Sequence, residues 1–452
     1  MNHTNTKLTI SILVNSSPFA KVLSLPCQRQ RGRFMRRADR PQFAAADEPT
    51  AAMAPGPPDP IAFLQEAVRC DTVNPPGNEA VLARMLCRVL DQAGIKTDLR
   101  LCRDGQANLV ATLQGNRPGR RLVLSGHLDT VPLGESEWTH DPFSATIIDG
   151  RMYGRGTADM KGGLLALLFA FLAFNIRNQG DFAGEVVFAA SFAEETGSHG
   201  ARQMVDDGHL PPFDAMIVAE PSSNQPINAH KGVLWVQVDA TGRTAHSSAP
   251  SEGVNVIDLL DRFRGDLGRL PLATDPNGHM TPATMAVTRI GAGKGNNVIP
   301  DKGFMVVDFR TLPGQDHGAL LGRLNAMARN IADARQGGTL TITPLLDLPA
   351  VETAADAAIL DAVRQGLAAV GRNGAPPGSA NYFTDASVFQ EIGQDIVILG
   401  PGRADQAHQT DEFIEIAEYL AAIDIYTAAI GAYLNTNDPD NRGTQPAERE
   451  KQ

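Results

Sequence analysis

Strand-length apolar runs alternate with helical segments along much of this chain, and that alternation limits the folds that it can adopt. The first such series comprises residues 121–126, 164–176, 185–192, 201–208 and 215–220. Continuous apolar strands separated by helices are typical of a parallel sheet that helices cover on both faces. The pattern therefore predicts an α/β fold with a doubly wound, mostly parallel sheet.

A different order of elements interrupts this series between residues 229 and 345. A strand at 232–240 is followed in turn by a helix, two strands, a second helix and a last strand. That β-α-β-β-α-β order is typical of a ferredoxin-like α+β domain. Afterwards the first pattern resumes, with helices at 357–371 and 412–434 around a strand at 395–400. We therefore predict a small domain at 229–345, inserted into a larger one formed by 56–228 and 346–434.

The bulk properties agree with a chain of two domains. A length of 452 residues exceeds the roughly 250–300 at which single cores stop growing. The net charge of −11 argues against nucleic acid or an anionic membrane surface as a partner. No apolar run approaches the roughly 20 residues of a membrane helix. Because no two of the four cysteines (Cys27, Cys70, Cys87, Cys102) are closely spaced, we expect reduced structural thiols and a cytoplasmic protein.

The first 55 residues differ in composition from the rest. Eight basic and three acidic residues fall within the first fifty, and a short apolar stretch, residues 8–14, lacks a clear cleavage site after it. A signal peptide, a transit peptide, or an over-extended start with Met35 or Met53 as the initiator are the alternatives. We expect residues 1–55 and the polar tail 435–452 to be disordered.

Polar side chains capable of catalysis come directly after the predicted strands. His127 and Asp129 end the strand at 121–126, and residues two apart in an extended segment face the same way, so the ring and the carboxylate can meet. A metal-binding imidazole usually donates its other N–H to a carboxylate, which fixes the tautomer. The alternative for this pair is a solvated loop.

A glycine-rich segment, residues 153–163, opens the most apolar predicted helix and carries Asp159. It lacks the Lys-Ser/Thr of a phosphate-binding loop and does not directly follow a strand, which argues against a nucleotide site. We interpret the glycines as letting the backbone approach a buried ion held by Asp159. A simple helix N-cap is the alternative for this residue.

Three further carboxylates and one histidine follow other strands. Glu194 and Glu195 come after the strand at 185–192, Glu220 ends the strand at 215–220, and His408 follows the strand at 395–400. Adjacent carboxylates repel unless a cation or a proton lies between them. Solvated loop positions are the alternative for the two glutamates and for His408.

Taken together, these residues predict two metal sites at the carboxyl ends of the strands, where ligands bind in open α/β sheets. Imidazole and carboxylate ligands suit zinc, cobalt or manganese. One carboxylate must bridge if the two ions lie roughly 3.5–4 Å apart, the usual spacing of two-metal sites.

Five ordered motifs make the prediction specific: SGHLDTVP, GRGTADMKGG, AEETGS, AEP and GPG followed by AH. With them the chain resembles the family of dinuclear zinc metallopeptidases that contains acetylornithine deacetylase and succinyl-diaminopimelate desuccinylase. Aminoacylases, glutamate carboxypeptidases and several dipeptidases also belong to it. The resemblance spans roughly residues 57–434 and implies a zinc-exopeptidase-like fold with two zinc ions per subunit.

The resemblance also implies a role for each residue. His127, Asp159 and Glu220 would hold one zinc, and Asp159, Glu195 and His408 the other, with Asp159 as the bridge. Glu194 would be the general base and acid, and Asp129 would orient His127.

In the inserted domain, the resemblance implies a lid that also forms a homodimer. His246 would reach the active site of the partner subunit to stabilise the oxyanion. Asn297 and Arg310 would bind substrate, and the Arg310 guanidinium could grip a carboxylate with two hydrogen bonds. Without the resemblance, His246 would be taken for a solvated loop residue.

The favoured function is therefore metal-dependent hydrolysis of the amide bond of an N-acyl amino acid. A dipeptidase or glutamate-type carboxypeptidase has the same metal chemistry and a different pocket, so it stays open as the alternative. A non-catalytic binding protein is the remote alternative, and Glu194 argues against it because a degenerate site is expected to lose its base. The acyl group, the amino acid and the native metal are not encoded in any motif that we recognise.

Overall fold

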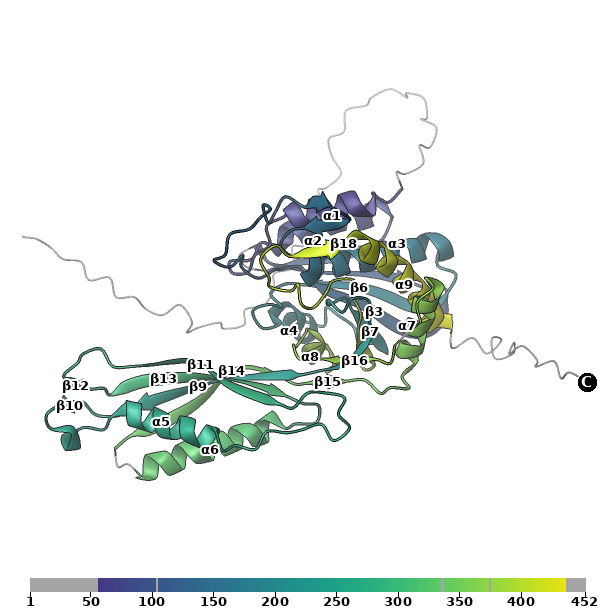
Figure 1. Cartoon of the computed structure of the whole chain (residues 1–452). Helices are drawn as coiled ribbons and strands as arrows, with labels where there is room; N and C mark the ends of the chain where they lie inside the picture. Colours follow the sequence, from purple (N-terminus) through teal and green to yellow (C-terminus); the bar gives the residue numbers. More distant parts are fainter. Residues whose placement is uncertain (1–55, 103–104, 335–336, 374, 436–452) are drawn as a thin grey trace, which may run out of the picture.

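The computed structural model describes residues 56–102, 105–334, 337–373 and 375–435. The predictions made for residues 1–55, for Cys27 and for the tail beyond residue 435 therefore lie outside the described part. Within the described residues, Cys70, Cys87 and Cys102 form no disulfide bond. Figure 1 shows a larger body built around one sheet and a smaller body built around a second sheet.

The larger sheet has the strand order β1-β2-β6-β3-β7-β17-β8-β15, with β16 beside β8. Its strands are β1 (Thr97–Leu101), β2 (Ala107–Gln114), β3 (Arg117–His127), β6 (Ala183–Ser191), β7 (Ala215–Val218), β8 (Ile227–His230), β15 (Val351–Glu352), β16 (Gly378–Ala380) and β17 (Ile396–Ile398). The four central strands β6, β3, β7 and β17 are parallel to one another. Strands β1, β2, β8 and β15 add antiparallel pairs toward the edges.

Helices cover both faces of this sheet, which confirms the predicted α/β class. One face carries α1 (Pro60–Arg69), α2 (Glu79–Gln92), α3 (Gly162–Asn178), α7 (Ala358–Ala369) and α9 (Ile416–Asn435), and the other carries α4 (His199–Asp206) and α8 (Ala386–Phe389). In β3, Leu122 and Leu124 belong to the core that contains α3, while Val123 belongs to the core that contains α4. Because alternate residues enter different cores, the strand must be apolar throughout.

Helix α3 lies at the centre of the larger body, and it corrects one prediction. The segment Thr157–Asn178 is 22 residues long and by its length and composition could cross a membrane, which the sequence analysis did not predict. However, 94% of its most apolar window is buried inside the protein. Helices α1 and α9 and strand β3 pack around it. Its apolar character is therefore explained by its place in the core.

The helix predicted at 412–434 is wrong at its start. Residues Phe413–Glu415 form strand β18, which pairs with β5 (Arg151–Tyr153), and β5 pairs in turn with β4 (Thr146–Ile148). The Phe413 ring lies 5.5 Å from the Tyr153 ring, centroid to centroid. The apolar pattern of Phe413–Glu415 merges with that of α9, so the sequence alone suggests one continuous helix. Pairing with the distant strand β5 makes this segment a strand instead, and the helix begins at Ile416.

The smaller body is the predicted ferredoxin-like unit. Its elements are β9 (Gly232–Thr241), α5 (Val256–Leu267), β11 (Thr284–Ala292), β13 (Lys302–Thr311), α6 (His317–Ala334) and β14 (Thr339–Leu348). The strand order is β11-β13-β9-β14, and all three pairs are antiparallel. Val236 and Val238 of β9 pack with Phe263 of α5 and Leu324 of α6. A two-stranded ribbon of β10 (Ala245–His246) and β12 (Val298–Ile299) lies at the end remote from the larger sheet (Figure 1).

Candidate metal centre

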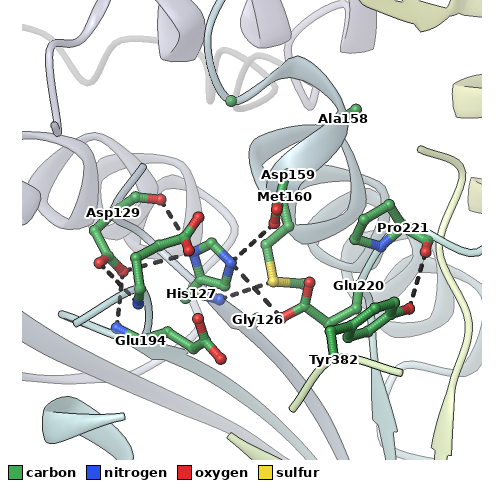
Figure 2. A network of polar contacts seen from close by, with 12 residues as sticks. Gly126, His127, Asp129, Ala158, Asp159, Met160, Glu194, Glu220, Pro221 and Tyr382 are labelled. Carbon is green, nitrogen blue, oxygen red and sulfur yellow. Dashed lines mark hydrogen bonds and ion pairs between the residues drawn. The ribbon is translucent and has the colours of Figure 1, made fainter. Parts of the chain in front are cut away.

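The carboxyl ends of the four parallel strands meet at one edge of the larger sheet, and the predicted ligands lie there. His127 is the last residue of β3, Glu194 follows β6, Glu220 follows β7, and His408 lies in the loop after β17. Asp159 comes from the turn Thr157–Lys161 that precedes α3. Figure 2 shows His127, Asp159, Glu194 and Glu220 converging from their separate segments.

Asp159 lies between the two histidines. His127 Nε2 is 3.2 Å from Asp159 Oδ1 and 3.6 Å from Glu220 Oε1. His408 Nε2 is 3.4 Å from Asp159 Oδ2 and 3.1 Å from Glu195 Oε2. Because its two oxygens face different histidines, Asp159 is placed as a bridging ligand would be. Its side chain contacts His127 and His408, which differs from the helix N-cap considered above.

The donor set fits metal ions. His127 and Glu220 with Glu194, and His127 and Asp159 with Glu195, form two groups whose ligand atoms lie within 4.8 Å of one another. Glu195 Oε1 is buried, and among the described residues it has no hydrogen-bond partner. Buried polar atoms are normally satisfied. A cation would satisfy this oxygen, and nitrogen and oxygen donors suit ions of the zinc class.

The electrostatics of this cluster favour a positive charge among its carboxyls. Burial, together with the charge of Glu220, raises the pKa of Glu194 well above its usual range. Burial and the neighbouring Asp159 raise the pKa of Glu195 to about 7, and the same two causes raise the pKa of Glu220 well above normal. Each of these carboxyls therefore resists ionisation, and either a proton or a cation can supply the counter-charge.

The pKa values of the two histidines are raised as well, but by the neighbouring carboxylates rather than by burial. Hydrogen bonds to Asp159 and Glu195 raise the pKa of His408 to about 10. Burial acts to lower the pKa of His127, but Asp159 and Glu220 outweigh it and raise this pKa well above normal. Burial likewise acts to raise the pKa of Asp159, and its hydrogen bonds with His127 and His408 reverse the sign and lower it. Asp159 is therefore the carboxylate that stays charged.

Asp129 contacts more than the His127 ring. His127 Nδ1 lies 3.0 Å from the backbone carbonyl oxygen of Asp129 and 3.5 Å from its Oδ1. The carboxylate accepts the backbone N–H groups of Glu194 and Glu195, and the side-chain amide of Asn74 donates to it at 3.1 Å. The carbonyl is thus the nearest group that can fix the ring tautomer, and the carboxylate holds the loop that carries the two glutamates.

A fully buried ion pair holds the turn that carries Asp159. Glu412 Oε1 accepts the backbone N–H groups of Ala158 and Asp159 at 2.8 and 3.0 Å. Its Oε2 accepts from Arg155 Nη1 at 2.7 Å and from the N–H of Gly156 at 2.9 Å. The Arg155 and Glu412 side chains are 1% and 0% exposed. Such a pair is costly to break, because the remaining charge would be buried alone.

The other end of the turn is held by Lys161. Its ammonium is buried and donates to the carbonyl oxygens of Ala67 and Cys70 at 3.0 and 2.7 Å. These carbonyls lie at the C-terminal end of α1, where a cation is favourable. Burial lowers the pKa of Lys161 to about 8.

The glycines within residues 153–163 serve a different purpose from the one that we predicted. Gly156 has a φ of 83°, in the left-handed region that favours glycine. A Cβ on Gly163 would collide with the Ala219 carbonyl oxygen, so this glycine lets α3 approach the segment before Glu220. The backbone thus approaches another backbone, and the interpretation that the glycines approach an ion is replaced.

The three predicted residues of the small domain do not join this cluster. His246 is exposed on β10, with Nδ1 2.7 Å from Ser248 Oγ. The Asn297 carbonyl accepts the N–H of Ser247, so these two segments lie together, at the end remote from the larger sheet (Figure 1). Arg310 on β13 donates from Nε and Nη2 to both carboxylate oxygens of Asp308, at 3.0 and 3.1 Å.

The model of peptidase family M20/M25/M40 matches residues 123–432 of the chain. The chain belongs to this family. The resemblance predicted from five motifs is therefore confirmed, and the protein is an enzyme of the metallopeptidase and amidohydrolase class.

Relatives of known name resemble most of the enzyme. A probable succinyl-diaminopimelate desuccinylase of Staphylococcus epidermidis is 30% identical over 409 residues, covering 83% of this chain and 98% of that protein. The acetylornithine deacetylase of Proteus mirabilis is 35% identical over 353 residues, covering 75% and 86%. A dinuclear metal-binding peptidase of the M20 family from Bacillus subtilis has a TM-score of 0.63 at 19% identity, over 83% of this chain and 98% of that one. This last likeness concerns the fold.

Several residues around the centre escaped the sequence analysis. They are Asn74, Glu79, Arg155, Lys161, Tyr382, Asp385 and Glu412. The Tyr382 hydroxyl donates to the carbonyl of Pro221, beside Glu220 (Figure 2). Ser191 Oγ, at the end of β6, donates to Asp385 at 2.5 Å. None of these residues follows a predicted strand, so position along the chain gave no signal. Arg155 and Lys161 gave the one available hint, because they are charged residues in a motif that is otherwise apolar or glycine-rich.

We predict that the enzyme takes up about two zinc-class ions per chain and releases protons as it does so. The raised pKa values of Glu194, Glu195, Glu220, His127 and His408 mean that the metal-free site holds protons that the ions displace. The affinity for Zn²⁺ should therefore rise with pH. Titration calorimetry with Zn²⁺ at pH 7, in two buffers of different ionisation enthalpy, measures the number of bound ions and the number of released protons. Uptake without any buffer dependence would contradict this account of the charges.

Proposed function

We propose that the enzyme hydrolyses the amide bond of an N-acyl amino acid, as a deacetylase or desuccinylase does, with Glu194 as the general base. The observation that carries the proposal is the buried Glu194 carboxylate beside the ligand groups of His127 and Glu220. Its raised pKa suits a group that must both take up and deliver a proton near neutral pH.

The proposed ligands follow the family pattern. His127, Asp159 and Glu220 would hold one zinc ion, and Asp159, Glu195 and His408 the other, with cobalt or manganese able to replace zinc. The position of Asp159 between the two histidines supports its role as the bridge. When bound, the ions would polarise the amide carbonyl and make water more acidic.

The chain's own groups would move the proton. Glu194 takes a proton from water as the water oxygen bonds to the amide carbon, and then delivers it to the nitrogen as the carbon–nitrogen bond breaks. The products are a carboxylic acid and a free amine. Asp129 contributes by fixing the backbone of Glu194 and Glu195, and through its carbonyl it keeps the His127 ring in one tautomer.

The named relatives support an acyl amino acid as substrate. The two curated relatives reported above act on an acetyl and a succinyl derivative, and the first is matched over 98% of its length. Arg310 and Asn297 of the inserted domain are the proposed substrate-binding residues. A substrate carboxylate at Arg310 would compete with Asp308, which now holds two of its donors. A dipeptidase or glutamate-type carboxypeptidase is the alternative, because the M20 relatives of known structure include peptidases.

The inserted domain, residues 229–345, is proposed to act as a lid and to form a homodimer. His246 is exposed on β10, which lies at the end of the smaller body remote from the larger sheet (Figure 1), and this suits a residue that serves a partner subunit. A C2 dimer would place equivalent surfaces against each other. We further propose a cytoplasmic enzyme with no nucleic-acid or membrane partner, in keeping with its net charge of −11.

A substrate screen tests the proposed function. We expect the zinc- or cobalt-loaded enzyme to release acetate from N-acetylornithine or succinate from N-succinyl-diaminopimelate, or the acyl group of a related amino acid. A kcat/KM above roughly 10⁴ M⁻¹s⁻¹ would lie in the normal range for an enzyme acting on its substrate. Activity confined to a panel of dipeptides, with none on acyl amino acids, would favour the alternative.

Glu194→Gln should lower kcat by about 10²–10⁴-fold, because general acid–base catalysis contributes that much. The substitution keeps the size of the side chain and removes the base, so metal content measured by elemental analysis should stay near two ions per chain. Turnover close to that of the wild type would show that another residue, such as Glu195, is the base.

Mixing two inactive variants tests the proposed dimer. Glu194→Gln and His246→Ala proteins are combined under conditions that allow subunits to exchange. Each mixed dimer then contains one site that lacks both groups and one intact site, so random exchange should restore about a quarter of wild-type activity. His246→Ala alone should lose about 10²–10³ in kcat, as expected for an oxyanion donor. No recovery, with exchange verified by labelled subunits, would place the action of His246 within its own chain or remove it altogether.

A further inference from the structure

The loop that carries Glu194 and Glu195 has each of its leading backbone amides held by a side chain from elsewhere in the chain. The acceptors for residues 192, 193, 194 and 195 are, in order, Asn108 Oδ1 at 3.2 Å, Glu79 Oε1 at 3.3 Å, Asp129 Oδ1 at 3.1 Å and Asp129 Oδ2 at 3.3 Å. Backbone hydrogen bonds within residues 192–200 close the loop on itself. The direction of the two glutamates thus depends on acceptors outside the loop.

Glu79 is the unusual member of this set. It is the first residue of α2 and fully buried. Its Oε1 accepts the Ala193 N–H, while its Oε2, also buried, has no hydrogen-bond partner among the described residues. Burial, with the charge of Asp129 adding to it, raises the pKa of this carboxyl to about 7. A buried carboxyl that uses one oxygen is costly for a fold to keep, so its single contact merits a functional explanation.

Glu79 accepts this hydrogen bond from Ala193, the residue at which the loop changes direction. Ala193 has a φ of 52°, in the left-handed region that is unfavourable for a residue with a Cβ. Glu194 and Glu195 follow directly and diverge. The Glu194 carboxylate groups with His127 and Glu220, and the Glu195 carboxylate groups with His127 and Asp159. The conformation at Ala193 therefore decides which carboxylate faces which part of the centre.

We propose that Glu79 is a positioning residue for Glu194. By accepting the Ala193 N–H it stabilises the left-handed turn and so aims the Glu194 carboxylate at the reacting groups. The catalytic part of this inference rests on the proposed role of Glu194 as the base. The structural part, that Glu79 holds the loop, does not depend on that role.

Glu79 could act by the reach of its side chain, as proposed, or only by its charge. An acidic residue in the first turn of a helix is favourable by itself, and that simpler role would need only a negative charge on α2. Glu79→Gln keeps an oxygen at the same reach and removes the charge. Glu79→Asp keeps the charge, but the side chain is shorter by one carbon–carbon bond, about 1.5 Å, and cannot reach the Ala193 N–H.

We expect Glu79→Asp to lower kcat about 10–100-fold, since misplacing a catalytic group by about 1 Å can cost about 100-fold. KM and the number of bound ions should change little, because Glu195 keeps its own backbone hydrogen bond to Asp129 and its contact with His408. Glu79→Gln should stay within about threefold of the wild type. The assay uses N-acetylornithine or N-succinyl-diaminopimelate, whichever is hydrolysed. The opposite order, with Asp active and Gln impaired, would overturn the proposal, as would equal kcat in both variants or a loss of metal.

Leu82→Ala is the matched control for general damage to α2. Leu82 is fully buried in the same helix, so this variant should lower the melting temperature and leave kcat unchanged below it. If Leu82→Ala lowers kcat as much as Glu79→Asp does, the effect is only one of stability and the proposal fails.

A measurement without substrate separates this inference from the proposed function. Hydrogen–deuterium exchange across residues 192–195 should be faster in Glu79→Asp than in the wild type and unchanged in Glu79→Gln. Unchanged exchange in Glu79→Asp would overturn the proposal even if the enzyme proves to be a deacylase. Faster exchange, together with full turnover by Glu194→Gln, would instead reject Glu194 as the base and keep Glu79 as the residue that holds the loop.

Discussion

The crowding of buried negative charge at the ends of four parallel strands is the constraint on which the rest of the structure depends. Parallel strands that are apolar throughout can carry polar side chains only where they end, and their ends lie at one edge of the sheet. Glu194, Glu195 and Glu220 meet there, and burial makes each of them resist ionisation. The fold tolerates this arrangement because protons or cations can occupy the space between them.

The supporting residues are organised around this centre in a consistent way. Carboxylates that face the ligand space have unsatisfied or shared oxygens, whereas the carboxylates behind it accept backbone N–H groups. Glu412 and Asp129 are of the second kind and fix the segments of Asp159 and of Glu194. The side chains of the candidate metal centre are thus held through their backbones, and preorganisation of this kind lowers the cost of binding and catalysis.

The sequence was sufficient where function follows from position along the chain. His127, Glu194, Glu220 and His408 come after strands that their apolar character reveals, and the topology of a parallel sheet brings such residues together. Glu412 could not be found this way, because it contacts a turn more than 250 residues earlier and lies among residues that resemble the start of a helix. Strand β18 was missed for the same reason, since its pairing partner β5 decides its structure. Contacts of this kind appear only when the closed fold is known.

The position of β17 has a consequence for how the protein is made. This strand lies between β7 and β8, although it follows both of them and the whole four-stranded unit in the sequence. Synthesis proceeds from the N-terminus, and segments can begin to fold as they emerge. The sheet of a nascent chain therefore lacks β17 until residues 396–398 have been synthesised, and His408 and Glu412 emerge later still. A growing chain consequently cannot assemble the candidate metal centre before these later residues have joined the strands made first.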